Sequence, residues 1–319
     1  MSSDGEDGKD LQAIAGNAIS EVMKYYVGND EVLKKILASI LASGHVLLQD
    51  FPGTGKTFLA KLLSSILGLS YRRIQFTPDL LPSDIIGTKV WQPLKGEFSV
   101  VKGPIFANLI LADEINRAPP KTQAALLEAM EERQVTIEGE TIPLQLPFIV
   151  IATQNPIEFE GTYPLPEAQL DRFMIRTSLG YPANELDVLR RRILWKKEDP
   201  SGEAQKIMDG DMLLRLRDFI ESNITVSDEV LNYIASFSGC RTDSRVLAGP
   251  SPRGVISLLR MSRAYALVSG RNYVTPDDVK TVSTEVLSHR IALKAEYMLE
   301  EVTPEAVLRE YVTKIKVPK

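Results

Sequence analysis

The 319-residue sequence contains one cysteine and two histidines, and this scarcity excludes several kinds of site. Cys240 has no partner for a disulfide within the chain, which favours a reducing compartment. The simplest interpretation of this cysteine is a small buried apolar side chain. His45 and His289 lie far apart in the sequence, so we expect no zinc site, which needs several such ligands.

Long hydrophobic runs are also absent. The longest apolar segments have the length of a strand, well short of the ~20 residues that cross a bilayer. Residues 1–10 are acidic and lack the basic-then-apolar order of a secretory signal. These features predict a cytoplasmic protein without membrane insertion, and residues 1–10 are predicted to form a disordered N-terminus.

Basic residues are outnumbered, with 37 Lys and Arg against 42 Asp and Glu and a formal net charge of −5. Binding to nucleic acid needs a basic face, so we expect no stable complex with it, although a local basic stripe is compatible with this total. The hydrophobic share of 44% is typical of a globular protein, and the length allows two domains.

The clearest chemical signal is the stretch DFPGTGKT at residues 50–57. An apolar run, residues 45–48, precedes it as a predicted strand, and a helical pattern, residues 58–67, follows it. Strand, glycine-bearing loop and helix N-terminus together present backbone N–H groups to an anion. In the phosphate-binding loop pattern, Lys56 would contact the outer phosphates and Thr57 would hold Mg²⁺. A chance Gly-Lys-Thr is the alternative, and the strand–loop–helix context favours nucleotide binding.

Apolar segments of strand length alternate with helical patterns in the first half of the chain. Besides residues 45–48, the strand candidates are Tyr71–Phe76, Leu109–Ala112, Phe148–Ala152 and Met174–Leu179. This alternation predicts an α/β fold with a parallel sheet of five strands covered on both faces by helices.

Two segments interrupt that alternation. Between Thr77 and Pro104 prolines and glycines recur, which indicates a functional insertion or, alternatively, an Ω-like surface loop. Residues 135–146 alternate in residue type around Gly139, which predicts a hairpin.

After Tyr181 the patterns become helical. The predicted helices are Leu186–Trp195, Asp211–Ile220, Glu229–Phe237, Val255–Val268, Asp277–Leu287 and Glu305–Ile315. Thr275-Pro276 and Thr303-Pro304 have the hydroxyl and proline that begin a helix. We therefore predict an α/β nucleotide-binding domain at 11–181 and a smaller all-α domain at 182–319.

Polar side chains follow two of the predicted strands. Asp113 lies at the carboxyl end of a buried strand, where it would orient Mg²⁺, and Glu114 would activate a hydrolytic water. Asn155 follows the next apolar strand, and its amide would lie beside Asp113. The alternatives are solvated charges that end a strand and an ordinary Asn-Pro turn.

This combination resembles the AAA+ ATPases and, among them, the MoxR family. The matching motifs are Val27-Gly28, Asp50–Thr57 in its Asp-x-Pro-Gly form, Leu111–Ala118, Gln123–Gln134, Ala152–Pro156, Leu165–Phe173 and Ser251–Arg253. They extend from about Leu11 to at least His289, and Asp50, which replaces the first glycine of the loop pattern, is common in the family.

The resemblance implies ATP and Mg²⁺ as ligands, and a lid as the role of the all-α domain. The implied ATP-binding residues are Val27, Gly28, Pro52, Gly53, Thr54, Gly55, Lys56, Thr57 and Phe58. Thr57 and Asp113 would hold the metal ion. Glu114, Lys56 and Asn155 would act in catalysis, Asn155 as the polar sensor.

Two arginines complete the implied site. Arg172 would be the arginine finger that enters a neighbouring subunit's site, and Arg253 would be the second sensor. A surface ion pair with Asp171 or Glu167 is the alternative for Arg172. Arg253 could be only an arginine at a helix start, an unusual position near the positive end of the helix dipole.

The leading functional hypothesis is a ring-forming ATPase, with six subunits as the family expectation, that remodels or matures a protein partner. The resemblance implies a partner with a von Willebrand factor A domain, with metal-cofactor insertion or complex assembly as the process. The insertion and the hairpin would face the central channel of the ring. The alternatives are a nucleic-acid motor and an ATP-gated binding switch that hydrolyses little ATP.

Overall fold

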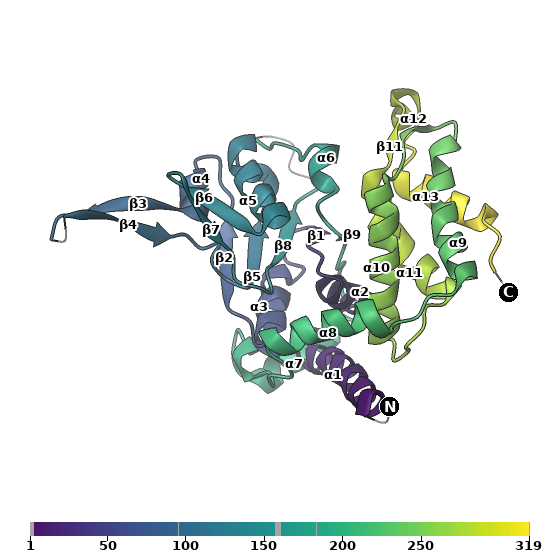
Figure 1. Cartoon of the computed structure of the whole chain (residues 1–319), viewed down its shortest axis with the longest axis horizontal. Helices are drawn as coiled ribbons and strands as arrows, with labels where there is room; N and C mark the ends of the chain where they lie inside the picture. The colour runs from purple at the N-terminus through teal and green to yellow at the C-terminus, as the bar shows by residue number, and fades with distance from the viewer. Residues whose placement is uncertain (1–2, 95, 157–160, 183, 319) are drawn as a thin grey trace.

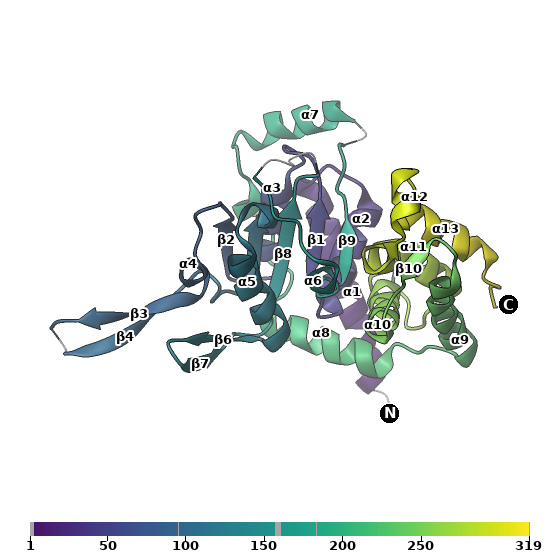
Figure 2. The ribbon, with the colours of Figure 1, turned by 90° about the horizontal axis from the view of Figure 1, so that it is seen from above.

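Five parallel strands form the central sheet of the computed structural model, which describes residues 3–94, 96–156, 161–182 and 184–318. The strands are β1 (Val46–Gln49), β2 (Tyr71–Gln75), β5 (Leu109–Asp113), β8 (Ile149–Gln154) and β9 (Ile175–Thr177). Their order across the sheet is β2-β5-β8-β1-β9, as Figures 1 and 2 show. The predicted fold class, a parallel five-stranded sheet flanked by helices, is confirmed.

Both faces of the sheet are buried, because the strands carry apolar side chains on both sides. One face packs on α1 (Ser3–Tyr25), α2 (Asp30–Leu41) and α3 (Lys56–Ile66), through side chains such as Leu48, Leu111 and Ile151. The opposite face packs on α5 (Pro120–Glu132), and its core includes Ile110 and Val150. Because the strands are parallel, the sheet has one edge formed by the amino ends of its strands and one formed by their carboxyl ends.

The N-terminus differs from its predicted disorder. Residues 3–10 continue α1 toward the start of the chain, whereas residues 1 and 2 lie outside the described residues. Leu11, Ala15, Ala18 and Val22 bury one face of α1. A helix nucleated by such packing propagates at little cost per residue, which explains the earlier helix start.

The insertion after β2 is regular rather than an irregular loop. It consists of α4 (Pro82–Ile86) and an antiparallel hairpin of β3 (Gly87–Gln92) and β4 (Glu97–Lys102), which projects from the domain in Figure 1. Of the glycines that suggested a loop, Gly87 and Gly103 stand at the base of this hairpin, and Gly96 lies in its turn. A Cβ at Gly87 would lie 2.2 Å from the Val101 carbonyl oxygen, so the backbones approach closely there.

A second hairpin, β6 (Gln134–Ile137) and β7 (Glu140–Pro143), turns at Gly139 as predicted. Two short elements flank the sheet ends, the 3-10 turn η1 (Ile115–Arg117) and α6 (Glu167–Leu170).

The second half of the chain is mainly helical, as predicted. Its helices are α7 (Glu185–Trp195), α8 (Gly210–Asn223), α9 (Asp228–Ser236), α10 (Pro252–Val268), α11 (Pro276–Leu287), α12 (Ala295–Leu299) and α13 (Pro304–Lys314). The 3-10 turns η2 (Ser201–Glu203), η3 (Phe237–Thr242) and η4 (Ser288–Arg290) and the strand pair β10 (Val246–Ala248) and β11 (Ala292–Leu293) connect them. The side chains of Thr275 and Thr303 accept hydrogen bonds from backbone N–H groups of the first turn, which fixes both helix starts.

These helices occupy two environments. In Figure 2, α9 to α13 form a group beside β9, whereas α7 lies above the sheet domain, apart from this group. Arg191 of α7 donates to the Met23 carbonyl oxygen at 2.6 Å, and the segment after α7 bonds to Ile66 through the Ile207 backbone N–H. The proposed boundary at residue 181 remains a prediction. Within the described residues, no helix has the length and apolar character to cross a membrane.

Candidate active site

The carboxyl ends of three neighbouring strands bring polar side chains into one row. In the parallel register, Gln75 stands opposite Asp113, and Ala112 stands opposite Ala152, so Thr153 follows beside Asp113. The Thr153 hydroxyl donates to Asp113 Oδ1 at 2.7 Å, and Arg73 Nε donates to Asp113 Oδ2 at 2.9 Å. Both oxygens of the Asp113 carboxylate therefore have fixed partners.

Glu114 leaves the strand in a left-handed conformation with φ of 57°. Its backbone N–H donates to Thr153 Oγ1 at 2.8 Å. Its carboxylate accepts hydrogen bonds from Gln75 Nε2 at 2.7 Å and from Arg117 Nη1 at 3.1 Å. A non-glycine residue in this conformation is uncommon, and here it turns the Glu114 side chain away from the strand direction.

The loop between β1 and α3 has the glycines it needs. Gly53 and Gly55 have φ values of 84° and 82°, which residues with a Cβ rarely adopt. Lys56 Nζ donates to the carbonyl oxygens of Asp50 at 2.9 Å and Phe51 at 3.0 Å. Burial lowers the pKa of Lys56, and the nearby carboxylates, Asp50 foremost, oppose that shift.

These groups line one cavity of about 440 Å³, formed by residues 52–58 together with Asp113, Glu114, Thr153 and Asn155. Its volume falls in the range of small-molecule sites. The N-terminus of α3 opens into it, which suits a phosphate. The Thr57 hydroxyl and the Asp113 carboxylate are oxygen donors of the kind that Mg²⁺ prefers, so these residues fit the predicted nucleotide and metal ion.

Val27 and Gly28, also predicted to bind the nucleotide, are not among the residues that line this cavity. They lie next to Tyr26, whose hydroxyl donates to the Thr54 carbonyl oxygen at 3.0 Å. A Cβ at Gly28 would come within 2.3 Å of the Tyr26 ring. Gly28 therefore leaves room for the ring that supports the loop.

Asp50 has a structural role that its position in the loop motif did not reveal. Its buried carboxylate accepts hydrogen bonds from the Ser178 hydroxyl at 2.6 Å and from the backbone N–H groups of Leu179 at 2.6 Å and Gly180 at 3.2 Å. The loop is thereby tied to the end of the edge strand β9.

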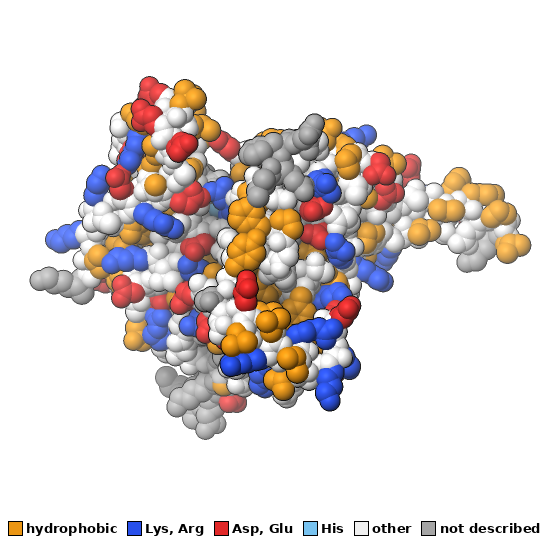
Figure 3. All heavy atoms as spheres, turned by 180° about the vertical axis from the view of Figure 1, so that it is seen from behind, with side chains coloured by type: hydrophobic (Ala, Val, Ile, Leu, Met, Phe, Trp, Pro, Cys, Tyr) orange, Lys and Arg blue, Asp and Glu red, His pale blue; other side chains and the backbone are white. Residues whose placement is uncertain are grey.

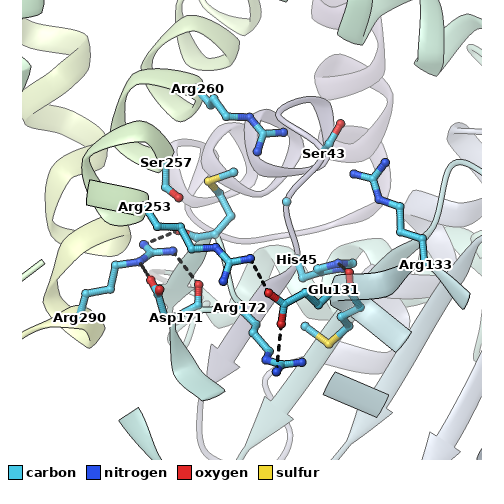
Figure 4. A pocket seen from close by; sticks show the side chains of 13 residues that line it. Ser43, His45, Glu131, Arg133, Asp171, Arg172, Arg253, Ser257, Arg260 and Arg290 are labelled. Carbon is cyan, nitrogen blue, oxygen red and sulfur yellow. Dashed lines mark hydrogen bonds and ion pairs between the residues drawn. The ribbon is translucent and has the colours of Figure 1, made fainter. Parts of the chain in front are cut away.

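Arg172 and Arg253, the two arginines predicted to act in catalysis, lie together but away from this cavity. Glu131 of α5 bridges them, at 3.0 Å from Arg172 Nη2 and 3.0 Å from Arg253 Nη2 (Figure 4). Arg172 also donates to the Leu127 carbonyl oxygen. All three residues line a separate cavity of about 150 Å³, whose wall includes residues 43–45 and Met174.

That second cavity is at the amino end of the sheet, because residues 43–45 precede β1 and Met174 precedes β9. Residues 52–58 follow β1 at the carboxyl end. The two cavities share no lining residue.

Comparison with known proteins places the chain in a family. Residues 45–175 match the model of the "ATPase family associated with various cellular activities (AAA)", and residues 240–311 match that of the AAA lid domain. Chaperone MoxR1 of Mycobacterium tuberculosis is 41% identical over 94% of this chain and 81% of its own length. Protein MoxR of Paracoccus denitrificans is 30% identical over 85% and 86%. The chain belongs to the MoxR family of AAA+ ATPases.

Two further proteins are similar to this chain. The uncharacterized protein YeaC of Bacillus subtilis is 44% identical over 97% of both chains. A crystal structure from Cytophaga hutchinsonii, of a protein assigned provisionally as an ATPase, has 40% identity and a TM-score of 0.91 over 99% of this chain and 98% of that one. The relatives named MoxR confirm the predicted family.

In this MoxR-family chain, sequence reasoning did not single out Gln75, Thr153 or Glu131. The first two became visible only from strand register, because each stands at the carboxyl end of a strand beside β5. Glu131 is one of several acidic residues near the end of α5, and no local pattern distinguishes it from Glu128 or Glu132. Its contact with Arg253 joins residues 122 positions apart.

Proposed function

We propose that this MoxR-family protein is a ring-forming, Mg²⁺-dependent ATPase that hydrolyses ATP at sites shared between neighbouring copies. In this proposal one copy supplies the cavity at residues 52–58, and the next copy supplies Arg172 and Arg253. The six-fold ring and the homo-oligomeric state are family expectations that we carry into the proposal.

The position of the two arginines carries this proposal. They lie at the amino end of β1, whereas the phosphate-binding loop lies at its carboxyl end. A strand of four residues spans about 13 Å at ~3.3 Å per residue. The arginines therefore lie away from their own chain's loop, and in this proposal a second copy supplies the anion that they contact.

Within the cavity, each residue has a distinct proposed role. Lys56 exchanges its two carbonyl partners for the outer phosphates of ATP, and the α3 N-terminus holds the same phosphates. Glu114 accepts a proton from the attacking water, and Asn155 orients that water. The neighbour's Arg172 neutralises charge that develops in the transition state, which is worth about 10³- to 10⁵-fold in rate.

Glu114 is held by Gln75 and Arg117, so it must exchange at least one of these hydrogen bonds to act on water. Thr57 and Asp113 would hold Mg²⁺, which neutralises phosphate charge when bound.

The biological task is proposed from the family. Relatives include a protein named chaperone MoxR1, which supports the remodelling or maturation of a partner protein. A partner with a von Willebrand factor A domain and a cytoplasmic location complete the proposal. The projecting hairpin β3–β4 would face the central channel of the ring, together with β6–β7.

Arg172→Ala tests the shared site. We expect the specific ATPase activity of the wild-type protein to rise with protein concentration, because each site needs a neighbour. The Arg172→Ala protein should lose at least about 10³-fold in turnover and still bind ATP. Turnover measured across a dilution series, together with binding of a fluorescent ATP analogue, separates the two effects.

Arg309→Ala is a matched control, because Arg309 is an exposed arginine on α13 outside both cavities. It should behave as wild type. Turnover that does not depend on concentration, or full activity of Arg172→Ala, would contradict the shared site.

A further inference from the structure

The cavity at the amino end of the sheet has more positive charge than its carboxylates neutralise. Five arginines line it, against only two carboxylates, Glu131 and Asp171. Both carboxylates are engaged on one side of the cavity, because Glu131 bridges Arg172 and Arg253 and Asp171 pairs with Arg290. The other two lining arginines are Arg133, which directly follows α5, and Arg260 of α10, and neither pairs with these carboxylates.

Arg133 ends α5 in a left-handed conformation with φ of 53°. Across the described part of the chain, no carboxylate pairs with its guanidinium. Arg260 donates to the Ala42 carbonyl oxygen at 2.6 Å, and among the described residues its one carboxylate neighbour is Glu221 at 3.6 Å. Glu221 is 54% exposed and lies closer to Arg263, at 3.0 Å, so it neutralises Arg260 weakly.

A third arginine strengthens the positive potential behind this side of the cavity. Arg217 of α8 is buried and donates to the Ile40 carbonyl oxygen at 2.9 Å. Burial lowers the pKa of Arg217 to about 10, and the charges of Arg133 and Arg260 act in the same direction. Burial likewise lowers the pKa of Arg260. The Glu221 carboxylate opposes that shift, and the Arg133 charge adds to it. The three arginine charges repel one another, and a bound anion would relieve that repulsion.

We propose that Arg133 and Arg260, with the Ser43 hydroxyl between them in Figure 4, form a binding subsite for a phosphate-class oxyanion beside the Arg172–Arg253 pair. Guanidinium groups bind phosphate oxygens in pairs, and a hydroxyl adds a further donor. The cavity of about 150 Å³ accommodates a single phosphate group rather than a whole nucleotide.

The oxyanion has two possible sources, free phosphate and the phosphate chain of ATP bound to a neighbouring copy. The second source rests on the proposed shared site. In that case Arg133 and Arg260 extend the contact that Arg172 and Arg253 make with the neighbour's nucleotide, and the subsite adds to the coupling between copies.

Phosphate binding to the isolated subunit tests the first source. Sodium phosphate is titrated calorimetrically into dilute, nucleotide-free Lys56→Ala protein, in which the loop at residues 52–58 lacks its lysine. Combining Arg133→Ala with Lys56→Ala should weaken phosphate binding about tenfold or more. Combining Arg133→Glu with Lys56→Ala should abolish phosphate binding, because the new carboxylate pairs with Arg260. Arg133 is exposed, so neither change disturbs the core.

A mixing experiment tests the second source. The Lys56→Ala protein retains all its arginines, and the Arg172→Ala protein retains its phosphate-binding loop. In a mixture of the two, an active site forms where a Lys56→Ala subunit supplies its arginines to the loop of an Arg172→Ala subunit. Replacing the first partner by the Lys56→Ala, Arg133→Ala double variant should lower the restored turnover at least about tenfold. Arg215→Ala, an exposed arginine on α8 outside the cavity, is the control in both experiments.

Each result has one meaning. Weaker phosphate binding with unchanged mixed turnover supports the subsite with free phosphate as its ligand, and lower mixed turnover supports the neighbour's nucleotide. The inference is overturned if Arg133→Ala changes neither measurement. If the mixture of Lys56→Ala and Arg172→Ala restores no turnover, the shared-site proposal fails, and the phosphate titration still decides the subsite.

Discussion

At the scale of single residues, one hydroxyl connects the two acidic residues of the candidate site. Thr153 donates to the Asp113 carboxylate and accepts from the Glu114 backbone N–H. It is 1% exposed, so water cannot replace either hydrogen bond. The Thr153 side chain therefore sets the orientation of both residues at once, although it is not itself expected to react.

Thr153→Val keeps the side-chain shape and removes both hydrogen bonds. We expect ATP turnover to fall about tenfold to a hundredfold, because Glu114 loses its fixed backbone orientation. ATP affinity should change much less, since Lys56 and the loop are untouched. Steady-state kinetics and nucleotide titration measure the two effects, and Thr153→Ser should retain activity. Wild-type turnover in Thr153→Val would contradict this role.

At the scale of elements, the hairpin β3–β4 is built outside the core. Trp91 and Phe98 form an edge-to-face pair, with ring centroids 5.1 Å apart, and remain 49% and 66% exposed. Figure 3 shows hydrophobic side chains along the projecting hairpin. By contrast, Ile85 at its base is fully buried. The tip thus contributes little to stability, and its apolar surface is available for contacts outside the chain.

Replacing residues 91–98 by Asn-Gly shortens the hairpin between Val90 and Ser99, which are paired in the antiparallel register. We expect the free energy of unfolding to stay within about 1 kcal/mol of the wild-type value, because the removed side chains are largely outside the core. Urea denaturation measures it. The control Ile85→Ala should cost about 2–5 kcal/mol. A large loss on shortening would mean that the tip supports the fold.

At the scale of the whole molecule, two buried histidines join its parts. His45 accepts a hydrogen bond from the Val150 backbone N–H at Nδ1, and its Nε2 lies 3.3 Å from the Met130 carbonyl oxygen, so it connects β1, β8 and α5. His289 Nε2 lies 3.1 Å from the Phe173 carbonyl oxygen and connects η4 to the segment before β9. Burial lowers the pKa of His45 to about 4 and that of His289 well below its ordinary value.

Stability should therefore fall with acidification. The unfolded histidines take up protons near pH 6.5, whereas the folded ones resist protonation, so their contribution is complete above pH 6.5 and is lost as the pH falls toward 4. At pH 5.5 each histidine should cost about 1 kcal/mol relative to pH 7.5. Urea unfolding at the two pH values measures this, and His45→Gln should reduce the difference. An unchanged difference would exclude His45 as its source.

Much of this architecture follows from local sequence. The strands β1, β5 and β8 were predictable because each lies in an apolar run of strand length, whereas β2 and β9 are mixed in residue type and were marked by only a few apolar positions. Thr275-Pro276 and Thr303-Pro304 fixed two helix starts through hydrogen bonds within one turn. The loop at residues 50–57 was also predictable from local sequence, because Gly53 and Gly55 supply its backbone conformation and Lys56 donates to carbonyl oxygens only five and six residues before it. The insertion predicted at 77–104 is present, and the alternative of an Ω-like loop is wrong, because the glycines mark the base and the turn of a hairpin between two neighbouring strands.

Tertiary structure alone decided which distant groups meet. The contacts of Asp50 with residues 178–180 and of Glu131 with Arg253 join segments far apart in the sequence, and so does the shared cavity that Arg133 and Arg260 line. Strand order and register determine such contacts, and both depend on how whole faces of the sheet are buried rather than on any local pattern. The sequence therefore determined the elements and the phosphate-binding loop, and only the packed sheet separated that loop from the arginines at its opposite end.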